Sequence, residues 1–278
     1  MVKPLIYVNL FTVGTSILSN FVRSGFRRDL LEKYADRRVG DWYRLPPQDE
    51  EQRFIESLRR GVDVYDALVD YVDKDPRAAS AELNAFYGFM GRWCLPYDAV
   101  EVYIYSTDTG TCWLCSRVIH DHLRRMGVKA QEPIRVKGWG LEDFERGLAN
   151  LLDKMAGIIS SKKRQGCRVF VNATGGFKPE STFAVLAASL LGADGVYYMH
   201  EAFKDIVYIP ILPLTVEKSY VKTLKKLGYW MPKRDAEELL RMHGYSLRDL
   251  EEMRLIEERD GKVIVKKWVR KLMAKASR

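Results

Sequence analysis

Small and hydroxylated residues gather in three short segments of the sequence, and each segment follows an apolar run. The three segments are Gly14-Thr15-Ser16, Ser106-Thr107-Asp108-Thr109-Gly110 and Asn172-Ala173-Thr174-Gly175-Gly176-Phe177-Lys178. Small side chains let a phosphate approach the backbone amides closely, and glycine supplies backbone angles that other residues adopt only at a cost. Any one of these segments could be an ordinary turn or helix cap. Three of them at successive strand ends favour a binding site for an anionic ligand.

The third segment says most about chemistry. It lacks the spacing of a Gly-x4-Gly-Lys-Ser/Thr phosphate loop and of the Gly-x-Gly-x-x-Gly dinucleotide fingerprint, which disfavours an ATP or NAD site. Lys178 stands just before Pro179, a residue typical of the first turn of a helix. A cation at this place opposes the helix dipole, so helix stability would favour an acid instead. We therefore expect Lys178 to face the ligand.

The segments between these loops predict an α/β fold. Apolar β-rich runs predict strands, and apolar residues spaced three and four apart predict helices. The predicted strands are 5–11, 99–105, 133–136, 167–172, 196–199 and 206–211. One predicted helix begins near Ile17, and three others cover 112–126, 141–163 and 179–191. Such alternation builds a Rossmann-like, mostly parallel sheet, whose ligands sit outside the carboxyl ends of the strands.

Residues from about 36 to 93 interrupt this alternation. Apolar spacing predicts three helices there, over 49–60, 62–72 and 78–92. The last of them is preceded by Asp75-Pro76, a capping residue followed by proline at the first helical position. We interpret this stretch as a helical insertion, or an extended crossover, within a first domain that covers residues 1–212.

The sequence changes character after Pro213. It predicts two short helices over 234–242 and 246–253, a hairpin over 255–266 that turns at Asp260-Gly261, and a basic tail over 266–278. This order predicts a small winged helix-turn-helix domain over 217–278, joined to the first domain by a linker near 212–216. The tail could contact DNA phosphates. A solvated helix face or a dimer contact explains its charge slightly better.

Composition places the chain in the ordinary globular class. Its 278 residues are 47% hydrophobic and 29% charged, and the formal net charge of +8 suits an anionic partner. The apolar segment Met1–Phe11 is too short for a membrane span and lacks the features of a signal peptide. Four cysteines do not make a secreted disulfide framework. We expect a cytoplasmic protein that does not associate with a membrane.

Three further motifs have both functional and ordinary explanations. Cys112-Trp-Leu-Cys115 resembles a thioredoxin motif, but buried thiols or a local disulfide explain it better in the middle of so long a domain. Arg117 and His122 fit the loose spacing of the HEPN ribonucleases, yet an exposed Arg and His are ordinary on a crossover helix. His200-Glu201 ends a predicted strand, where a ligand contact and a structural hydrogen bond are about equally expected.

Four stretches together resemble the archaeal CRISPR-associated Rossmann-fold (CARF) proteins, in particular the ring nucleases that carry a C-terminal winged helix. The stretches are Val13–Ser16, Ser80–Asn84, Val171–Pro179 and Tyr197–Glu201. The Thr-Gly-Gly-Phe-Lys run within the third stretch is the most specific of these signals. The resemblance covers the length of the first domain, and the order of the predicted elements extends it to the end of the chain.

The resemblance implies a homodimer that binds a cyclic oligoadenylate, usually the four-membered ring, in a groove across its two-fold axis. Ring nucleases cut this messenger, without a metal or other cofactor, into linear di-adenylate with 2′,3′-cyclic phosphate ends, and so switch off type III CRISPR signalling. The family's essential lysine matches Lys178, its pocket serine matches Ser16, and an arginine used by some members matches Arg77. Some members have a basic residue in the second loop, where this chain has none, which leaves its catalytic rate open.

The implied chemistry is coherent with the residues present. The ribose 2′-hydroxyl attacks its own 3′-phosphodiester, so the substrate brings the nucleophile. Lys178, assisted by the amides of Gly175 and Gly176, would stabilise the charge that develops on phosphorus. Ser16 would hydrogen-bond a phosphate oxygen or the 2′-hydroxyl. The sequence shows no general base, which predicts a slow enzyme.

Two functions of different classes stay open at this point. The first is the ring nuclease, with Lys178 and Ser16 as catalytic residues and no metal. The second is a non-catalytic cyclic-oligoadenylate sensor that acts as a transcription regulator through its winged helix. For both, the expected ligand-binding residues are Gly14, Thr15, Arg77, Thr107, Asp108, Thr109, Gly110, Asn172, Thr174, Gly175, Gly176 and Phe177.

Overall fold

A seven-stranded sheet forms the centre of the computed structural model, which describes residues 5–138, 144–176, 178–200, 205–209, 211–212 and 214–276. The strand order is β3-β2-β1-β5-β6-β7, and β4 also pairs with β2. The strands are β1 (Tyr7–Val13), β2 (Val100–Ser106), β3 (Lys129–Ala130), β4 (Ile134–Arg135), β5 (Arg168–Asn172), β6 (Gly195–His200) and β7 (Asp205–Ile209). Neighbouring strands run parallel except for β6 and β7. The predicted Rossmann-like, mostly parallel sheet is confirmed.

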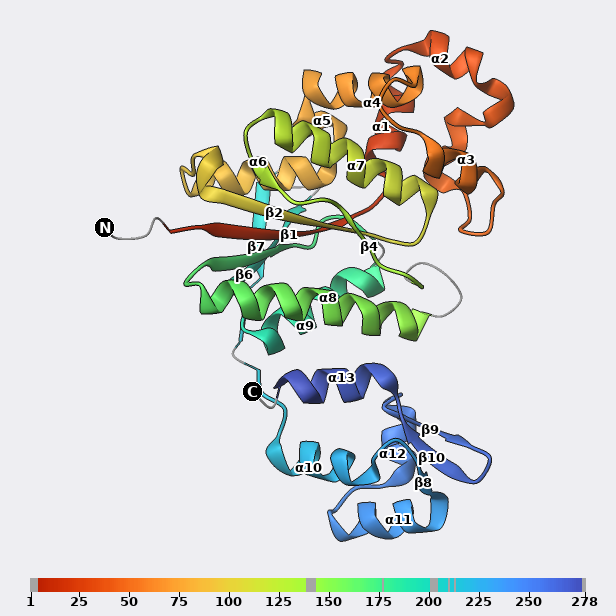
Figure 1. The fold of residues 1–278 in the computed structure, drawn as a ribbon, viewed down its shortest axis with the longest axis vertical. Helices are drawn as coiled ribbons and strands as arrows, with labels where there is room; N and C mark the ends of the chain where they lie inside the picture. Colours follow the sequence, from red (N-terminus) through yellow and green to blue (C-terminus); the bar gives the residue numbers. More distant parts are fainter. Residues whose placement is uncertain are drawn as a thin grey trace.

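Helices cover both faces of this sheet (Figure 1). One face is covered by the helices that connect β1 to β2 and by α7 (Gly110–Arg125). The other face is covered by α8 (Phe144–Arg164) and α9 (Lys178–Leu191). Residues of a strand point alternately to opposite faces, so β1 feeds both layers. Phe11 and Val13 join the core under the first layer, whereas Val8 and Leu10 join the core under the second. None of the helices in the described part of the chain has both the length and the apolar character needed to cross a membrane.

The long connection from β1 to β2 is entirely helical. Its helices are α1 (Ser16–Ser24), α2 (Arg28–Lys33), α3 (Glu51–Ser57), α4 (Asp63–Lys74), α5 (Pro76–Ala79) and α6 (Ala81–Arg92), with 3-10 turns η1 (Ala35–Arg37), η2 (Val39–Arg44) and η3 (Tyr97–Ala99). The helix predicted over 78–92 is therefore two helices. They separate at Ser80, whose hydroxyl accepts from the Leu83 amide and caps α6.

The C-terminal residues form a compact unit with its own apolar core. Its helices are α10 (Lys218–Leu227), α11 (Lys233–Met242), α12 (Leu247–Glu252) and α13 (Lys267–Ala276), and its three-stranded sheet joins β8 (Met231–Pro232), β10 (Lys262–Val265) and β9 (Ile256–Arg259). The core includes Leu224, Leu240, Val263 and Met273. The expected helices and hairpin are present, and residues 267–276 of the basic tail form α13. The assignment of the unit as a winged helix and the linker near 212–216 stay predictions.

Within this unit, helix α13 faces the layer formed by α8 and α9 (Figure 1). Its Lys271 forms an ion pair with Asp153 of α8, and Lys266, just before α13, forms one with Glu145. The Trp268 ring meets the Phe183 ring of α9 edge to face, with centroids 6.0 Å apart. Part of the basic charge of the tail therefore holds the C-terminal unit against the α/β part of the chain.

A buried histidine of α7 joins this helix to α4 and α6. His122 is only 2% exposed, and its Nδ1 lies 2.6 Å from Oδ1 of Asp73 on α4. Its Nε2 lies 2.7 Å from the hydroxyl of Tyr87 on α6. Burial lowers the pKa of His122 below its ordinary value of 6.5, although the hydrogen bond and the charge of Asp73 act in the opposite direction.

We predict that folding stability decreases as the pH falls below about 6.5, because of His122. Below about pH 6.5 the His122 imidazole takes up a proton in the unfolded chain but stays neutral in the folded protein. Its contribution to stability is therefore complete above the unfolded pKa and is lost as the pH falls through the lower, folded pKa. Urea unfolding between about pH 7 and pH 5.5 gives the free energy of unfolding at each pH, and its slope against pH should be smaller in His122→Asn than in the unsubstituted protein. An unchanged slope in the variant would show that other groups cause the pH dependence.

Candidate functional site

The sheet has a topological switch point between β1 and β5. From β1 the chain moves outward to β2, β3 and β4, and it then returns to place β5 on the opposite side of β1. Loops that leave adjacent strands in opposite directions open a crevice at the carboxyl edge of the sheet. The glycine-rich loops after β1 and β5 meet there, because a Cβ added to Gly14 would lie 3.1 Å from the Gly176 amide nitrogen.

A cavity of about 420 Å³ occupies this edge of the sheet. Five predicted residues line it: Gly14, Thr15, Thr107, Thr109 and Gly176. The other lining residues are Tyr43, Arg44, Leu45, Pro47, Thr111 and Cys112. The structure therefore brings all three predicted loops to one cavity, and the helical insertion supplies an additional wall with an aromatic ring and a guanidinium group.

Three helices begin at the cavity, and they differ in how their first turns are capped. The Thr109 hydroxyl accepts from the Cys112 amide and so caps α7. Thr15 occupies the same position before α1, but its side chain does not cap the helix, and its hydroxyl donates to the Tyr43 carbonyl oxygen at 3.0 Å. Helix α9 begins at Lys178. The N-terminus of α1 therefore directs its partial positive charge toward the crevice without a side-chain cap.

A buried carboxylate lies directly beneath the loops after β1 and β5. Glu82 of α6 is 1% exposed, and its Oε1 accepts from the Gly14 amide at 2.8 Å. Its Oε2 accepts from the hydroxyls of Ser16 at 2.8 Å and Ser80 at 2.7 Å. Three donors thus satisfy a charge that would otherwise be costly to bury.

Two glycines in the loop after β5 are required for different reasons. A Cβ added to Gly175 would lie 2.2 Å from Glu82 Oε1 and 2.5 Å from the Thr12 carbonyl oxygen, so only glycine fits. Gly176 has a φ of 97°, a left-handed backbone that favours glycine. Gly175 therefore allows close packing inside the protein, whereas Gly176 shapes the cavity surface.

Several predicted ligand residues are engaged within the protein. The Asp108 carboxylate pairs with Arg135 at 2.8 Å and accepts from the Gly138 amide. A Cβ added to Gly110 would lie 2.0 Å from the Gln52 carbonyl oxygen, so this glycine lets α7 pack on α3.

The remaining predicted residues lie in different surroundings. Asn172 is fully buried; its amide donates to the Glu82 carbonyl oxygen, and its Oδ1 accepts from Thr174. Arg77 is outside the cavity lining, with its guanidinium 6.0 Å from the centre of the Tyr87 ring. Phe177 and the side chain of Lys178 lie outside the described residues.

Sequence reasoning missed Glu82, Tyr43 and Arg44. Glu82 lies in the Ser80–Asn84 stretch that carries part of the resemblance, but an acid two residues after a serine N-cap is ordinary in the first turn of a helix, so no role was predicted for it. Tyr43 and Arg44 belong to η2, within a stretch that was interpreted only as helical. Only the packing of this insertion against the carboxyl edge of the sheet shows their place.

The Cys112-Trp-Leu-Cys115 motif forms buried thiols rather than a redox pair. Neither cysteine forms a disulfide, and both lie in the first turns of α7. Burial raises the pKa of the Cys115 thiol well above its usual range, and Cys112 and Glu82 add to the shift. A reactive cysteine needs the opposite shift, toward the thiolate.

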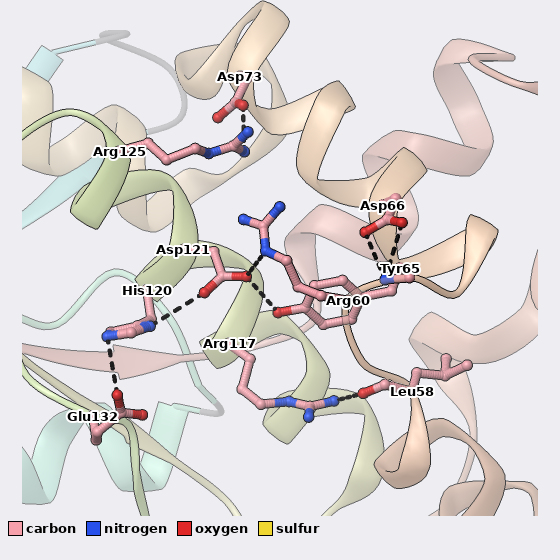
Figure 2. Close-up of polar contacts among 11 residues, drawn as sticks. Leu58, Arg60, Tyr65, Asp66, Asp73, Arg117, His120, Asp121, Arg125 and Glu132 are labelled. Atoms are coloured by element: carbon pink, nitrogen blue, oxygen red, sulfur yellow. Dashed lines mark hydrogen bonds and ion pairs between the residues drawn. The ribbon is translucent and has the colours of Figure 1, made fainter.

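Arg117 and His122 lie in separate environments, and the expectation that both are exposed is wrong, because His122 is buried and Arg117 is partly buried. Arg117 donates to the Leu58 carbonyl oxygen beside the Tyr65 ring (Figure 2). The adjacent Asp121 accepts from Arg60 at 2.8 Å and from the Tyr65 hydroxyl at 2.9 Å (Figure 2). These bonds attach α7 to the turn between α3 and α4 and to the start of α4. His122, in contrast, bonds to Asp73 near the end of α4.

At the end of β6, His200 has its ring 6.2 Å from that of Tyr198, and Glu201 lies outside the described residues. Among the residues that the structure describes, His, Cys, Asp and Glu side chains do not gather in groups of three that could hold a metal ion.

We predict that Gly175→Ala destabilises the protein by about 1–3 kcal/mol, because the added methyl group must displace either Glu82 or the β1 strand end. The matched control is Gly157→Ala on the exposed face of α8, where an added Cβ meets no atom within 4 Å. The control should be neutral or more stable by up to about 1 kcal/mol. Urea unfolding of both variants checks this, and equal stability would contradict the close packing at Gly175.

One comparison with known proteins bears on this site. Residues 77–212 match the model of the family described as CRISPR-associated protein (Cas_APE2256). The matched region runs from α5 to the residues after β7 and includes Glu82 and the loops that follow β2 and β5. Over this region the chain is similar to a CRISPR-associated protein family, and the match supports a CRISPR-associated protein.

Proposed function

We propose that this protein is a ring nuclease that binds cyclic tetra-adenylate and cleaves it to linear di-adenylate with 2′,3′-cyclic phosphate ends. The observation that carries the proposal is the cavity at the switch point, where glycine loops and helix N-termini converge. Such a site suits the phosphodiester groups of a nucleotide ligand. The similarity to a CRISPR-associated family and the resemblance to CARF ring nucleases favour a cyclic oligoadenylate as that ligand.

The proposed reaction uses the substrate's own nucleophile. A ribose 2′-hydroxyl attacks the adjacent phosphorus, and the protein must hold the attack in line and stabilise the additional negative charge. Lys178 supplies a positive charge for this purpose, assisted by the backbone amides of the glycine loop. A homodimer would place two such loops around a ring that has two-fold symmetry.

Ion pairs within the protein weigh against the alternative, a transcription regulator that reads DNA through the C-terminal unit. Helix α12 and strand β9 carry the exposed acids Asp249, Glu252, Glu257 and Glu258 together with the exposed bases Arg248 and Arg259. Arg248 pairs with Glu252 at 2.8 Å. Binding of DNA requires cations opposite the phosphates, and acids there repel them. Of the basic tail, Lys266 and Lys271 already pair with acids of α8.

We expect Lys178→Ala to reduce the single-turnover cleavage rate about a hundredfold or more, because a cation opposite a developing charge acts mainly in the transition state. Binding of the ring, measured by calorimetry, should change far less. Ser16→Ala should show a smaller loss of rate, because it removes a neutral hydroxyl rather than a full charge opposite the transition state. Lys222→Ala, an exposed lysine on α10, is the control and should cleave like the unsubstituted protein. Absence of cleavage by the unsubstituted protein would contradict the proposed function.

We also expect cleavage to continue unchanged in EDTA. The substrate hydroxyl is the nucleophile and Lys178 supplies the positive charge, so the proposed mechanism has no step for a metal ion. Chromatographic separation of the products, with and without EDTA, tests this. A rate that is lost in EDTA and restored only by magnesium or manganese would overturn the proposed mechanism.

A further inference from the structure

The hydrogen bonds of Ser16 restrict what its hydroxyl can do for a ligand. Its Oγ donates its proton to Glu82 Oε2 at 2.8 Å and accepts from the Ala81 amide at 3.2 Å. A hydroxyl has one proton and two lone pairs. One lone pair therefore remains, and Ser16 can accept a hydrogen bond from a ligand but has no proton left to donate to a phosphate oxygen.

The acceptor orientation is imposed by the surroundings of the carboxylate. Glu82 Oε2 also receives the Ser80 hydroxyl, and Oε1 receives the Gly14 amide, so every described bond of this carboxylate is one that it accepts. A carboxylate without a proton can only accept, so the Ser16 proton must point toward Glu82.

Glu82 cannot reach a ligand directly. It is 1% exposed and lies under Gly14 and Gly175. Ser16 is half-buried at the first position of α1; it is not among the residues that line the cavity, but it follows Gly14 and Thr15, which do line it. One hydrogen bond joins the two side chains, and a ligand hydroxyl that donated to Ser16 would extend it to a chain of two that ends at the buried carboxylate.

We propose that Glu82 is the general base of the proposed reaction and acts through Ser16 as a two-proton relay. This inference depends on the proposed ring-nuclease function and names a general base for it. In the step, the 2′-hydroxyl proton moves to Ser16 Oγ while the Ser16 proton moves to Glu82 Oε2. The bond from the 2′-oxygen to phosphorus forms, and the bond from phosphorus to the 5′-oxygen breaks. The leaving 5′-oxygen takes a proton from water, and Glu82 later returns its proton to the resulting hydroxide.

The relay assigns Ser16 to the 2′-hydroxyl rather than to a phosphate oxygen. It makes Ser16 a catalytic residue that contacts the attacking group, and Glu82 a residue that acts through it. A purely structural Glu82 would hold Gly14 and Ser16 in place but take up no proton. The two roles differ in the number of protons that move during the chemical step.

The test is single-turnover cleavage of cyclic tetra-adenylate in mixtures of H₂O and D₂O. The unsubstituted protein should show a curved dependence of rate on deuterium fraction, because two protons move together. Glu82→Gln keeps the side-chain shape but removes the base, and it should be about a hundredfold slower or more, with a linear dependence. Ring affinity should change far less than the rate, and a melting curve shows whether the variant is folded.

Ser80→Ala is the matched control for a structural effect. Ser80 donates to the same Oε2 atom but is fully buried, so it cannot contact the ring. It should lower stability and retain the curved dependence. Ser16→Ala should give a linear dependence even if Glu82→Gln does not fold. A curved dependence in Ser16→Ala, or cleavage by Glu82→Gln at the unsubstituted rate, would overturn the relay and leave the proposed function standing.

A binding measurement separates failure of the relay from failure of the proposed function. If Ser16 accepts from the 2′-hydroxyl, the 2′-deoxy ring should bind the unsubstituted protein about tenfold more weakly than the ribose ring. The two rings should bind Ser16→Ala equally. Absence of ribose-ring cleavage would overturn the enzymatic function together with the relay. The same ring preference in both proteins would overturn the Ser16 contact alone.

Discussion

The structure of the site depends on one buried carboxylate and the donors that satisfy it. Glu82 accepts from the Gly14 amide, the Ser16 hydroxyl and the Ser80 hydroxyl, and so joins the end of β1, the start of α1 and the start of α6. Leaving a buried carboxylate with an unsatisfied oxygen is costly, so these three segments are constrained together. The same carboxylate requires glycine at position 175, where any side chain would collide with it.

The helical insertion supplies several parts of the site. Helix α6 brings Glu82 under the crevice, η2 brings Tyr43 and Arg44 to its wall, and the Thr15 hydroxyl donates to the Tyr43 carbonyl oxygen instead of capping α1. Helix α3 reaches the same edge, since the Thr111 amide donates to Gln52. The insertion is thus part of the site rather than an appendage to the sheet.

The C-terminal unit uses its charges in two ways. Its basic helix α13 faces the acids of α8 and packs Trp268 on Phe183 of α9. Helix α9 begins at the ligand loop, so the unit is attached to an element that enters the site. Elsewhere on the unit, basic side chains pair with acids of the unit itself, Lys233 with Glu258 and Arg248 with Glu252.

The sequence by itself determined the α/β class, the position of the three loops after strands and the helical character of the β1–β2 connection, because strand alternation, helical apolar spacing and glycine placement are local signals. It identified the loops but not which of their residues face a ligand. Asp108 and Gly110 have the same composition signal as Thr107 and Thr109, and only their contacts with Arg135 and Gln52 separate them. Tertiary structure alone decided the role of Glu82, because the chemistry of a carboxylate depends on its burial and its donors. Those donors come from residues 2 to 68 positions away along the chain.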